Sequence, residues 1–549
     1  MGRVTNAAIR GAASRGGVFL VVLGLAVVAA ASAFAGSLWG LALLVLAPLV
    51  LLGVRDLTQP QHSLMRNFPL VAHVRWGFEA LRPYLRQYIV EDDLSGRPFN
   101  HNERALVYAR SKGEEDRQPF GSELDAYASD YEWLTHSLAP TPVAEGGFRV
   151  AVGGPACSKP YAAAVLNISA MSFGSLGGNA IAALNLGAKL GGFYHDTGEG
   201  SVSRHHRLHG GDICWEVASG YFGCRNKDGT FSPERFAETA GDEAVKLVEI
   251  KLSQGAKPGH GGVLPGGKVT AEIAEARGVG VGEDCISPAA HSAFSTPIEM
   301  MHFIARLREL AGGKPVGLKL CVGHPSEVFA LVKAMLLTGI RPDFIVVDGA
   351  EGGTGAAPQE MADHLGMPLR EGLVIVRNAL VGANLRSEVR LAASGKVSTG
   401  FKMAVNMALG ADWCNAARPF MFALGCVQSM KCHTGRCPTG VTTSDPLLQR
   451  GLVVPLKAER VASFQRHTVA ALADLVAAAG LAHPRELAPR HVWRRVNPIE
   501  VKTLDRIYPF LAPGALVEAP DETPYADDWR AADPATFLPR IDVGPQRHG

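Results

Sequence analysis

Short apolar runs alternate with helical stretches along the middle of the chain, and this alternation limits the possible folds more than any other feature. Seven runs predict strands: Ala164–Met171, Gly192–His195, Lys246–Leu252, Pro315–Cys321, Asp343–Asp348, Val389–Ala393 and Asp412–Asn415. Helices are predicted between them at residues 178–189, 297–311, 326–338, 373–384 and 400–409. Repeated β-then-α units indicate an α/β fold with a parallel sheet. Their number favours a closed (β/α)8 TIM barrel over a doubly wound sheet, since no G-x-G-x-x-G opens the first unit.

Two apolar runs precede this region, Val18–Ala35 and Leu38–Val54, with Gly36 and Ser37 between them. Each is near the lower length limit for a membrane-spanning helix, so we expect a transmembrane helical hairpin. Arginines flank both runs: Arg3, Arg10, Arg15, Arg55 and Arg66. Positive flanks place both ends in the cytoplasm, which predicts a protein of the cell inner membrane with a cytoplasmic catalytic domain. A cleaved signal peptide and a hairpin buried in a soluble protein are the alternatives.

The charge balance and the glycine content narrow the range of partners. The chain has a formal net charge of +2 and no basic run, so nucleic acid is not an expected partner. The 62 glycines concentrate between residues 148 and 440, which predicts tight turns and close approach of the backbone to a ligand. The nine cysteines show no disulfide pattern and indicate a reducing compartment.

These features divide the chain into four parts. Residues 1–60 form the anchor, with helices at about 18–35 and 38–54, and residues 61–145 form a helical or irregular collar. The collar is expected to contain helices at Arg82–Asp93 and Asn102–Arg110. Residues 146–445 form the barrel, and residues 446–549 hold one apolar helix, Ala462–Ala479, followed by a Pro-rich tail.

Three cysteines stand close together at the end of the barrel region: Cys426, Cys432 and Cys437, in a C-x5-C-x4-C run. Glycine and proline around them predict a winding loop in which the sulfurs converge, as thiolates do around soft metals and iron–sulfur clusters. A tetrahedral zinc site needs a fourth ligand, and His433 is the obvious one. Three cysteines without a fourth suit a three-iron cluster with one ligand per iron. Buried thiols without a metal are the remaining alternative.

Two glycine-rich loops follow consecutive late strands of the predicted barrel. The first, Asp348–Pro358, offers successive backbone amides that can form an anion-binding nest, with the hydroxyl of Thr354 as a further donor. The second, Ala393–Gly400, opens a helix, and helix N-termini bind phosphate. Since (β/α)8 barrels often keep a phosphate site at their last strands, the two loops together predict a phosphate-bearing cofactor. Tight turns without a ligand are the alternative for either loop alone.

With these loops and the cysteine run, roughly residues 145–445 resemble the synthase domain of glutamate synthases, which carries FMN and a 3Fe-4S cluster. Further motifs carry the resemblance: Met-Ser-Phe-Gly at 171–174, Thr-Gly-Glu-Gly at 197–200, Val-Ala-Ser-Gly at 217–220 and Gln-Gly-Ala-Lys-Pro-Gly at 254–259. The resemblance implies that Cys426, Cys432 and Cys437 bind the 3Fe-4S cluster.

The resemblance also implies an FMN site at the ends of the strands. Its expected residues are Met171, Ser172, Gln254, Lys319, Gly349, Gly352, Gly353, Thr354, Gly355, Ser394, Gly395, Thr399 and Gly400. Lys319 is expected near flavin N1, where it would stabilise the charge of the reduced ring. For the substrate, Lys257 and Arg277 are expected to hold carboxylates. Glu199 would hold the imino nitrogen, and Ser219 would face the substrate.

The implied function is an oxidoreductase acting on CH-NH2 groups, which reduces the 2-imino acid formed from 2-oxoglutarate and ammonia to glutamate. Val263 stands where the family has Gln in the 2-oxoglutarate pocket, and Glu351 replaces an Asp in the first glycine-rich loop. No glutamine amidotransferase domain fits before residue 145, so we expect free ammonia, a partner subunit or another amine as the nitrogen source. The expected electron partner is a ferredoxin, an NAD(P)H-oxidising subunit or a quinone. The alternatives are a membrane-linked flavin dehydrogenase for another small amino or hydroxy acid, and a non-catalytic scaffold.

Overall fold

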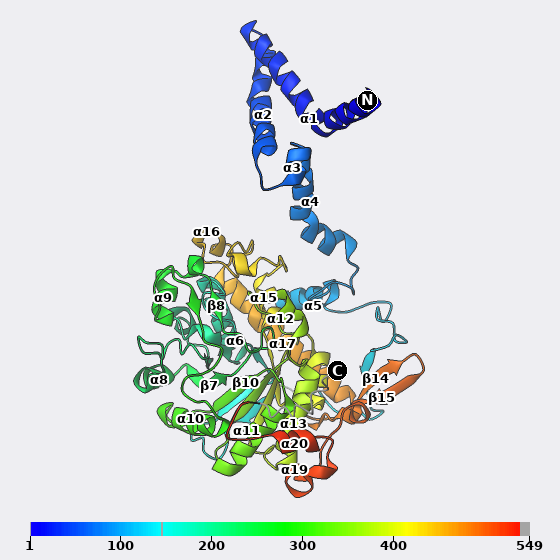
Figure 1. Ribbon diagram of the computed structural model, residues 1–549. Coiled ribbons are helices and arrows are strands. Elements are labelled where there is room, and N and C mark those ends of the chain that lie inside the picture. Colours follow the sequence, from blue (N-terminus) through cyan, green and yellow to red (C-terminus); the bar gives the residue numbers. More distant parts are fainter. Residues whose placement is uncertain (1, 144–146, 539–549) are drawn as a thin grey trace, which may run out of the picture. The chain divides into compact units, whose positions relative to one another are not determined.

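Eight parallel strands close into a barrel in the computed structural model, which describes residues 2–143 and 147–538 and, from residue 16 onward, their side chains (Figure 1). The strands are β4 (Leu166–Ile168), β5 (His195–Asp196), β6 (Ile213–Val217), β7 (Val245–Lys251), β10 (Val316–Leu320), β11 (Phe344–Asp348), β12 (Arg390–Ser394) and β13 (Trp413–Ala416). Their order around the barrel follows the chain, and β13 pairs with β4 to close it. The predicted (β/α)8 barrel is therefore confirmed, with β6 as an eighth strand that the sequence pattern did not reveal.

Helices surround this barrel on the outside (Figure 1). They are α6 (Gly178–Gly191), α7 (Arg204–Arg207), α8 (Pro233–Ala240), α9 (Ala271–Arg277), α10 (Pro297–Leu310), α11 (Pro325–Thr338), α12 (Gln359–His364), α13 (Leu369–Gly382), α14 (Gly400–Ala408), α15 (Arg418–Leu424), α16 (Pro446–Gln449) and α17 (Val454–Ala478). The long α17 packs against α6, α14 and α15. Gly187 allows the approach of α6, since a Cβ there would lie 2.5 Å from a methyl carbon of Val461.

A hairpin of β2 (Arg149–Val152) and β3 (Tyr161–Ala164) precedes the barrel. Its residues Val152 and Ala163 are fully buried in one apolar cluster with barrel residues such as Leu247 and Trp413. The strands continue away from this cluster toward their carboxyl ends. The chemistry of a barrel of this kind is expected at those ends.

The segment after the barrel contains more structure than the predicted apolar helix and Pro-rich tail. β14 (Val492–Asn497) and β15 (Glu500–Thr503) form a hairpin, and β1 (Glu132–Leu134) from far earlier in the chain pairs with β14. Short helices follow: α18 (Leu504–Ile507), α19 (Ala515–Glu518) and α20 (Ala526–Ala531). The local sequence could not indicate this sheet, because its pairing partner is distant in the chain. A second small hairpin, β8 (Val263–Leu264) with β9 (Cys285–Ile286), belongs to the loop after β7.

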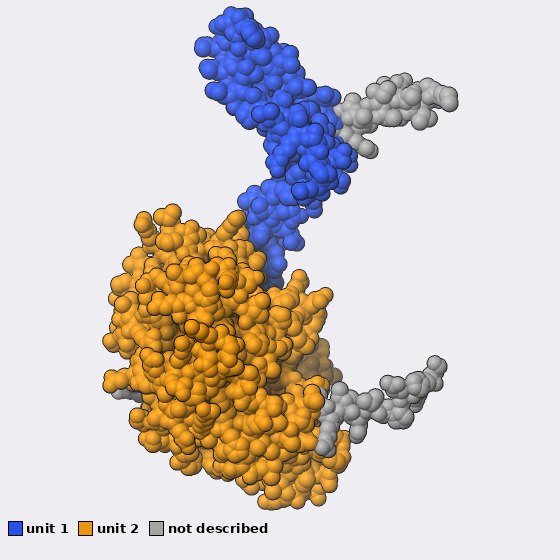
Figure 2. Space-filling view, turned by 60° about the vertical axis from the view of Figure 1, so that its left-hand side comes forward, with its two compact units in different colours: residues 1–101 blue, residues 102–549 orange. Residues whose placement is uncertain are grey.

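The chain divides into two compact units, residues 1–101 and 102–549 (Figure 2). The first consists of α1 (Gly2–Phe34), α2 (Leu43–Thr58), α3 (Ser63–Asn67), α4 (Ala72–Leu85) and a π-helical turn at Arg86–Val90, while α5 (His101–Lys112) begins the second. Two segments are long and apolar enough to cross a membrane, Gly16–Phe34 and Leu38–Thr58. The ring of Phe19 lies against Gly53, where a Cβ would come within 2.2 Å of it, so a small residue lets α1 and α2 pack.

Candidate active site

The loops after β11 and β12 present unpaired backbone donors at the mouth of the barrel. The amides of Gly353, Thr354 and Gly355 donate to no protein acceptor within residues 2–143 and 147–538. The amides of Gly395 and Lys396 likewise lack an acceptor in the described part of the chain, and Gly395 has a φ of +155°. A row of donors from two neighbouring strand ends suits a phosphate or another acceptor-rich group. The predicted cofactor loops therefore meet in space and fit such a group.

Other predicted cofactor residues have structural roles in this protein. The amides of Gly349 and Gly352 donate to the carbonyls of Ser394 (2.8 Å) and Gly349 (2.9 Å). Thr399 caps α14, since its hydroxyl accepts from the amide of Lys402 at 3.1 Å. Gly400 faces α17, where a Cβ would lie 2.7 Å from the backbone nitrogen of Leu472. These contacts account for the residue types without a cofactor, so their part in cofactor binding stays a prediction.

Two carboxylates hold the first glycine-rich loop in place. Asp348, at the end of β11, accepts from the amide of Gly255 at 2.9 Å and so joins this loop to the one after β7. Gly255 allows the approach, because a Cβ there would lie 1.8 Å from the carbonyl oxygen of Gly349. Glu351 accepts from the amide of Leu369 at 3.0 Å at the start of α13. Its carboxylate therefore anchors the loop to this helix.

Glu199, Ser219 and Gln254 line one small pocket at the mouth, together with Lys251 and His260. The hydroxyl of Ser219 donates to the carbonyl of Pro288, and the ammonium of Lys257, buried just behind the pocket, donates to the carbonyl of Gly261 at 3.0 Å. The loop that carries Lys257 lies close over Glu199, because a Cβ on Gly262 would touch the Glu199 carboxylate. Val263 is half exposed in β8 and pairs with Ile286.

Three cations determine the charge state of Glu199. Lys251 donates to its carboxylate at 3.0 Å. Burial raises the pKa of Glu199. The charges of Lys251, Arg277 and Lys257 together lower it by more than burial raises it, so the pKa lies below its ordinary value. Burial lowers the pKa of Lys257, and the neighbouring charge of Glu199 raises it again in part. The structure thus brings the predicted substrate residues Glu199, Lys257 and Arg277 within electrostatic reach of one another.

Arg277 links the predicted cofactor and substrate residues. Its side chain is buried, and one of its terminal nitrogens donates to the carbonyl of Phe173 at 3.0 Å and lies 3.4 Å from the hydroxyl of Ser172. The guanidinium also lies 5.1 Å from the centroid of the Phe222 ring. Met171 is buried in the same strand-end loop as Ser172. The Met-Ser-Phe-Gly segment and Arg277 are therefore in direct contact.

A buried charge network fills the barrel beneath this pocket. Lys319 donates to Glu216 at 2.7 Å and lies 3.9 Å from Glu249, while Lys251 lies 3.4 Å from Glu216. Burial lowers the pKa of Lys319, but the carboxylates of Glu216, Asp348, Glu249 and Asp196 raise it more, so its pKa lies well above the ordinary value. Glu216 was not among the predicted residues. It lies in the undetected strand β6 and is the closest counter-ion of Lys319.

Three further buried groups, Asp196, Cys214 and Glu249, have ligand atoms within 4.8 Å of one another. The pKa of Asp196 is raised to about 7, mainly by burial and, to a smaller extent, by the charge of Glu216. Burial, and then Asp196, raises the pKa of Glu249 well above its ordinary value. Neighbouring carboxyl groups that cannot both ionise share protons, so this cluster holds protons inside the folded barrel.

Asp196→Asn is expected to flatten the pH dependence of stability. Folded Asp196 keeps its proton up to about pH 7, whereas in the unfolded chain its pKa has the ordinary value of 3.8. Between these values the folded state binds more protons, so the free energy of unfolding falls as pH rises, by up to about 1.4 kcal/mol per pH unit. Asn keeps the acceptor for the amide of Gly198 without this proton. Denaturant unfolding from pH 4 to pH 8 measures the slope. Asp363→Asn, on the surface, is the control, and an Asp196→Asn slope equal to that of the control contradicts the assignment.

The cysteine loop follows α15 directly. Cys426 and Cys437 are buried and Cys432 is half-buried, and all three are free thiols. The amide of Gln428 and a guanidinium nitrogen of Arg418 lie 3.5 Å from the sulfurs of Cys426 and Cys432, respectively. Although burial raises the pKa of Cys437, hydrogen bonds from Thr439 and Thr442 lower it to about 7. Burial raises the pKa of Cys426 to about 11. The donors around the loop therefore favour a thiolate at Cys437, whereas Cys426 ionises when a cation binds its sulfur.

Arg418 connects the cysteine loop to the first glycine-rich loop. Its guanidinium donates to the carbonyl of Thr354 at 3.0 Å and to the sulfur of Cys432 at 3.5 Å. Gly355 lies beside Cys432, since a Cβ there would be 3.5 Å from the cysteine Cβ. The two predicted cofactor sites are thus direct neighbours. Sequence reasoning missed Arg418, because nothing in the local pattern indicates a contact across 64 residues.

Several known proteins are similar to this chain. A family described as "Conserved region in glutamate synthase" matches residues 157–482. A "Glutamate synthase large subunit-like protein YerD" of Bacillus subtilis is 37% identical over 495 residues, covering 83% of this chain and 94% of that protein. An "Archaeal-type glutamate synthase (NADPH)" of Thermotoga neapolitana is 33% identical over 57% of this chain, which spans 59% of that protein's length. Among solved structures, a mandelate oxidase mutant with an FMN adduct has 15% identity and a TM-score of 0.39, covering 77% of this chain and 99% of that one.

Proposed function

Because the chain belongs to the glutamate synthase family, we propose that it is an FMN- and iron–sulfur-dependent oxidoreductase that reduces a 2-imino acid to an amino acid. The 2-imino acid forms from a 2-oxo acid, with 2-oxoglutarate as the first candidate, and ammonia; the product is then glutamate. The family and the class of enzyme predicted from the sequence are confirmed. The cofactors, the substrate and the site residues form the proposal.

One observation supports this reaction best: Lys251, Arg277 and Lys257 place positive charge near Glu199, which lines the small pocket at the mouth. Lys257 and Arg277 bind the two carboxylates of the substrate. Glu199, ionised beside Lys251, accepts a hydrogen bond from the imino nitrogen and orients it. Holding the reacting carbon in one orientation supplies most of the rate in cofactor enzymes.

The amides of Gly353, Thr354, Gly355 and Gly395 would hold the FMN phosphate or ring acceptors, and Gln254 and Lys319 would contact the ring. Bound FMN supplies hydride transfer, and the cluster held by Cys426, Cys432 and Cys437 supplies single-electron transfer. Lys319, with Glu216 as its closest carboxylate, stabilises negative charge next to the ring. Arg418 keeps the two loops in contact.

Analysis of the bound cofactors tests the proposal. The purified protein is expected to release FMN on denaturation and to contain about three irons per chain. Electron paramagnetic resonance of the oxidised protein is expected to show the three-iron signal. Recovery of FAD, or of one zinc without iron, would contradict the corresponding assignment.

We also propose that the first unit anchors the protein to the inner membrane, with the barrel on the cytoplasmic side. Besides the two apolar helices, α4 and its flanks carry an exposed apolar stripe at helical spacing: Val71, Val74, Phe78, Leu81 and Leu85. Buried Asp56, near the end of α2, accepts from His73 and from the amide of Leu70, each at 2.9 Å, and so holds the start of α4. A helix with arginines beside an apolar stripe suits a membrane surface. The chain is expected to sediment with membranes at high salt and to need detergent for release.

The second candidate function is a membrane-linked flavin dehydrogenase. The two apolar helices and the apolar stripe of α4 favour it, because a membrane-anchored enzyme can pass electrons to a carrier in the membrane. It shares the cofactors with the first candidate and differs in the direction of electron flow. Reduction of a quinone analogue by a small amino or hydroxy acid, without ammonia, would identify it.

A further inference from the structure

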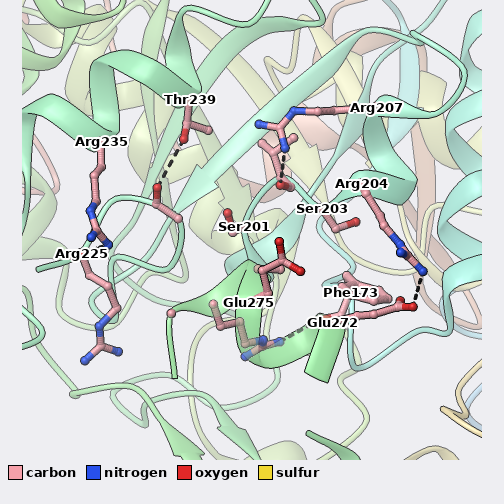
Figure 3. A pocket seen from close by; sticks show the side chains of 15 residues that line it. Phe173, Ser201, Ser203, Arg204, Arg207, Arg225, Arg235, Thr239, Glu272 and Glu275 are labelled. Carbon is pink, nitrogen blue, oxygen red and sulfur yellow. Dashed lines mark hydrogen bonds and ion pairs between the residues drawn. The ribbon is translucent and has the colours of Figure 1, made fainter. Parts of the chain in front are cut away.

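A second cavity, of about 310 Å³, lies outside the candidate substrate pocket and shares no lining residue with it. Five segments enclose it: the strand-end loop at Phe173, residues 201–207 including α7, the turn at 223–225 after β6, α8, and α9 (Figure 3). Of its lining residues, only Arg277 has a role in the function proposed above. Its size is that of a small-molecule site.

The charges around the cavity are strongly unbalanced. Five arginines line it: Arg204, Arg207, Arg225, Arg235 and Arg277. Only two acidic residues do so, Glu272 and Glu275, which leaves a formal lining charge of +3. Guanidinium groups are donors without acceptor capacity. An occupant must therefore be an acceptor-rich anion.

Three of the arginines already have partners, as Figure 3 shows in part. Arg204 pairs with Glu272, and Arg207 pairs with Asp242 at 2.7 Å and donates to the carbonyl of Val202 at 3.0 Å. Arg277 donates to the carbonyl of Phe173. Arg225 and Arg235, by contrast, form no ion pair within residues 2–143 and 147–538, and Arg235 donates to the backbone carbonyl of Arg225 at 2.9 Å. These two adjacent cations are available to a ligand.

Two of the lining arginines, Arg225 and Arg277, have Nε atoms that are buried and make no hydrogen bond in the described structure. A bound oxyanion would place negative charge beside these two guanidinium groups. We propose that this cavity binds a small oxyanion, a dicarboxylate or a phosphate, held by Arg225 and Arg235 and in contact with Arg277. Both oxyanions match the planar fork of a guanidinium group.

One aromatic ring, that of Phe222, connects the cavity to Arg277, which is proposed above to bind a substrate carboxylate. The guanidinium groups of Arg225 and Arg277 lie 5.6 and 5.1 Å from the centroid of the Phe222 ring. An anion beside Arg277 competes with the substrate carboxylate for the charge of this arginine. Occupancy is therefore expected to raise the apparent KM for the 2-oxo acid about fivefold or more, with a small change in kcat. This coupling rests on the proposed function, whereas the binding itself does not.

Calorimetric titration of the detergent-solubilised holoenzyme with succinate and, separately, with inorganic phosphate tests the binding. All titrations use the Lys257→Gln variant, in which the proposed substrate site binds succinate weakly. The heat of binding then comes mainly from the cavity. In this background, Arg225→Gln and the exposed Arg235→Gln are each expected to weaken binding about tenfold or more, while the exposed Arg490→Gln has no effect. Arg235→Gln keeps the test valid if Arg225→Gln fails to fold.

Binding of succinate alone identifies a dicarboxylate site, and binding of phosphate alone identifies a phosphate site; both support the proposal. If neither anion binds, or if all four proteins bind with equal affinity, the proposal is wrong. The titration needs no turnover, so its failure is distinct from failure of the proposed reaction.

Discussion

Replacement of Glu216 by alanine is expected to destabilise the barrel by about 3–5 kcal/mol, one of the largest effects of any single substitution in this chain. Lys319 is 3% exposed and donates to Glu216 at 2.7 Å, and Lys251 lies 3.4 Å from the same carboxylate. Removing one partner of a buried ion pair leaves the other charge without solvent or counter-ion. Lys319 then keeps only Glu249, at 3.9 Å, as a nearby ion-pair partner, whereas Lys251 keeps Glu199 at 3.0 Å.

Denaturant unfolding, followed by the fluorescence of buried Trp215 and Trp413, measures the effect. Glu216→Gln keeps the volume and one acceptor and is expected to cost less than Glu216→Ala. Asp521→Ala, which breaks an exposed pair with Arg530, is the matched control, with a cost of no more than about 1 kcal/mol. A Glu216→Ala variant as stable as this control would show that the network does not hold the barrel together.

The second large effect is expected at the cysteine loop. The Cys432→Ser variant should contain little iron and still bind FMN. Its rate of turnover in reactions that pass electrons through the cluster should fall by about 100-fold or more. Cys432 is half-buried, so a serine hydroxyl fits without a packing defect. Its neighbour Gly355 and the bridging Arg418 belong to the other loop and are unchanged.

Iron analysis, flavin content and electron paramagnetic resonance of the same preparation separate the two cofactors. Cys157→Ser is the matched control, since Cys157 is also half-buried but lies outside the loop, where its thiol donates to the carbonyl of Gly313 at 3.3 Å. This control should keep full iron. Equal iron in both variants would mean that Cys432 is not a ligand.

The barrel was predictable because most of its strands are short apolar runs bounded by glycine or charged residues. β6 was missed because Glu216 interrupts its apolar pattern, although the carboxylate is buried against Lys319. The pattern could not show this, since the counter-ion lies on another strand. The hairpin β14–β15 was missed for a related reason, because β1 completes its sheet from far away in the sequence.

The candidate site was predictable where function depends on residue types in a fixed local order. The cysteine run and the two glycine-rich loops are of this kind, and the structure brings the first loop against Cys432. Residues that act through space escaped prediction: Arg418 between the two loops, and Arg225 with Arg235 at the second cavity. Thr399 and Gly400 show the opposite case, where contacts with Lys402 and Leu472 explain a motif assigned to cofactor binding.

The most direct test of the proposed reaction is a single turnover of the reduced enzyme in a stopped-flow instrument without oxygen. We expect 2-oxoglutarate and ammonium together, but neither alone, to accelerate reoxidation of the flavin and to yield glutamate in proportion to it. Arg277→Ala is expected to raise the concentration of 2-oxo acid that is needed. Reoxidation no faster with both reagents than without them, and no effect of Arg277→Ala for any 2-oxo acid tried, would contradict the proposed function.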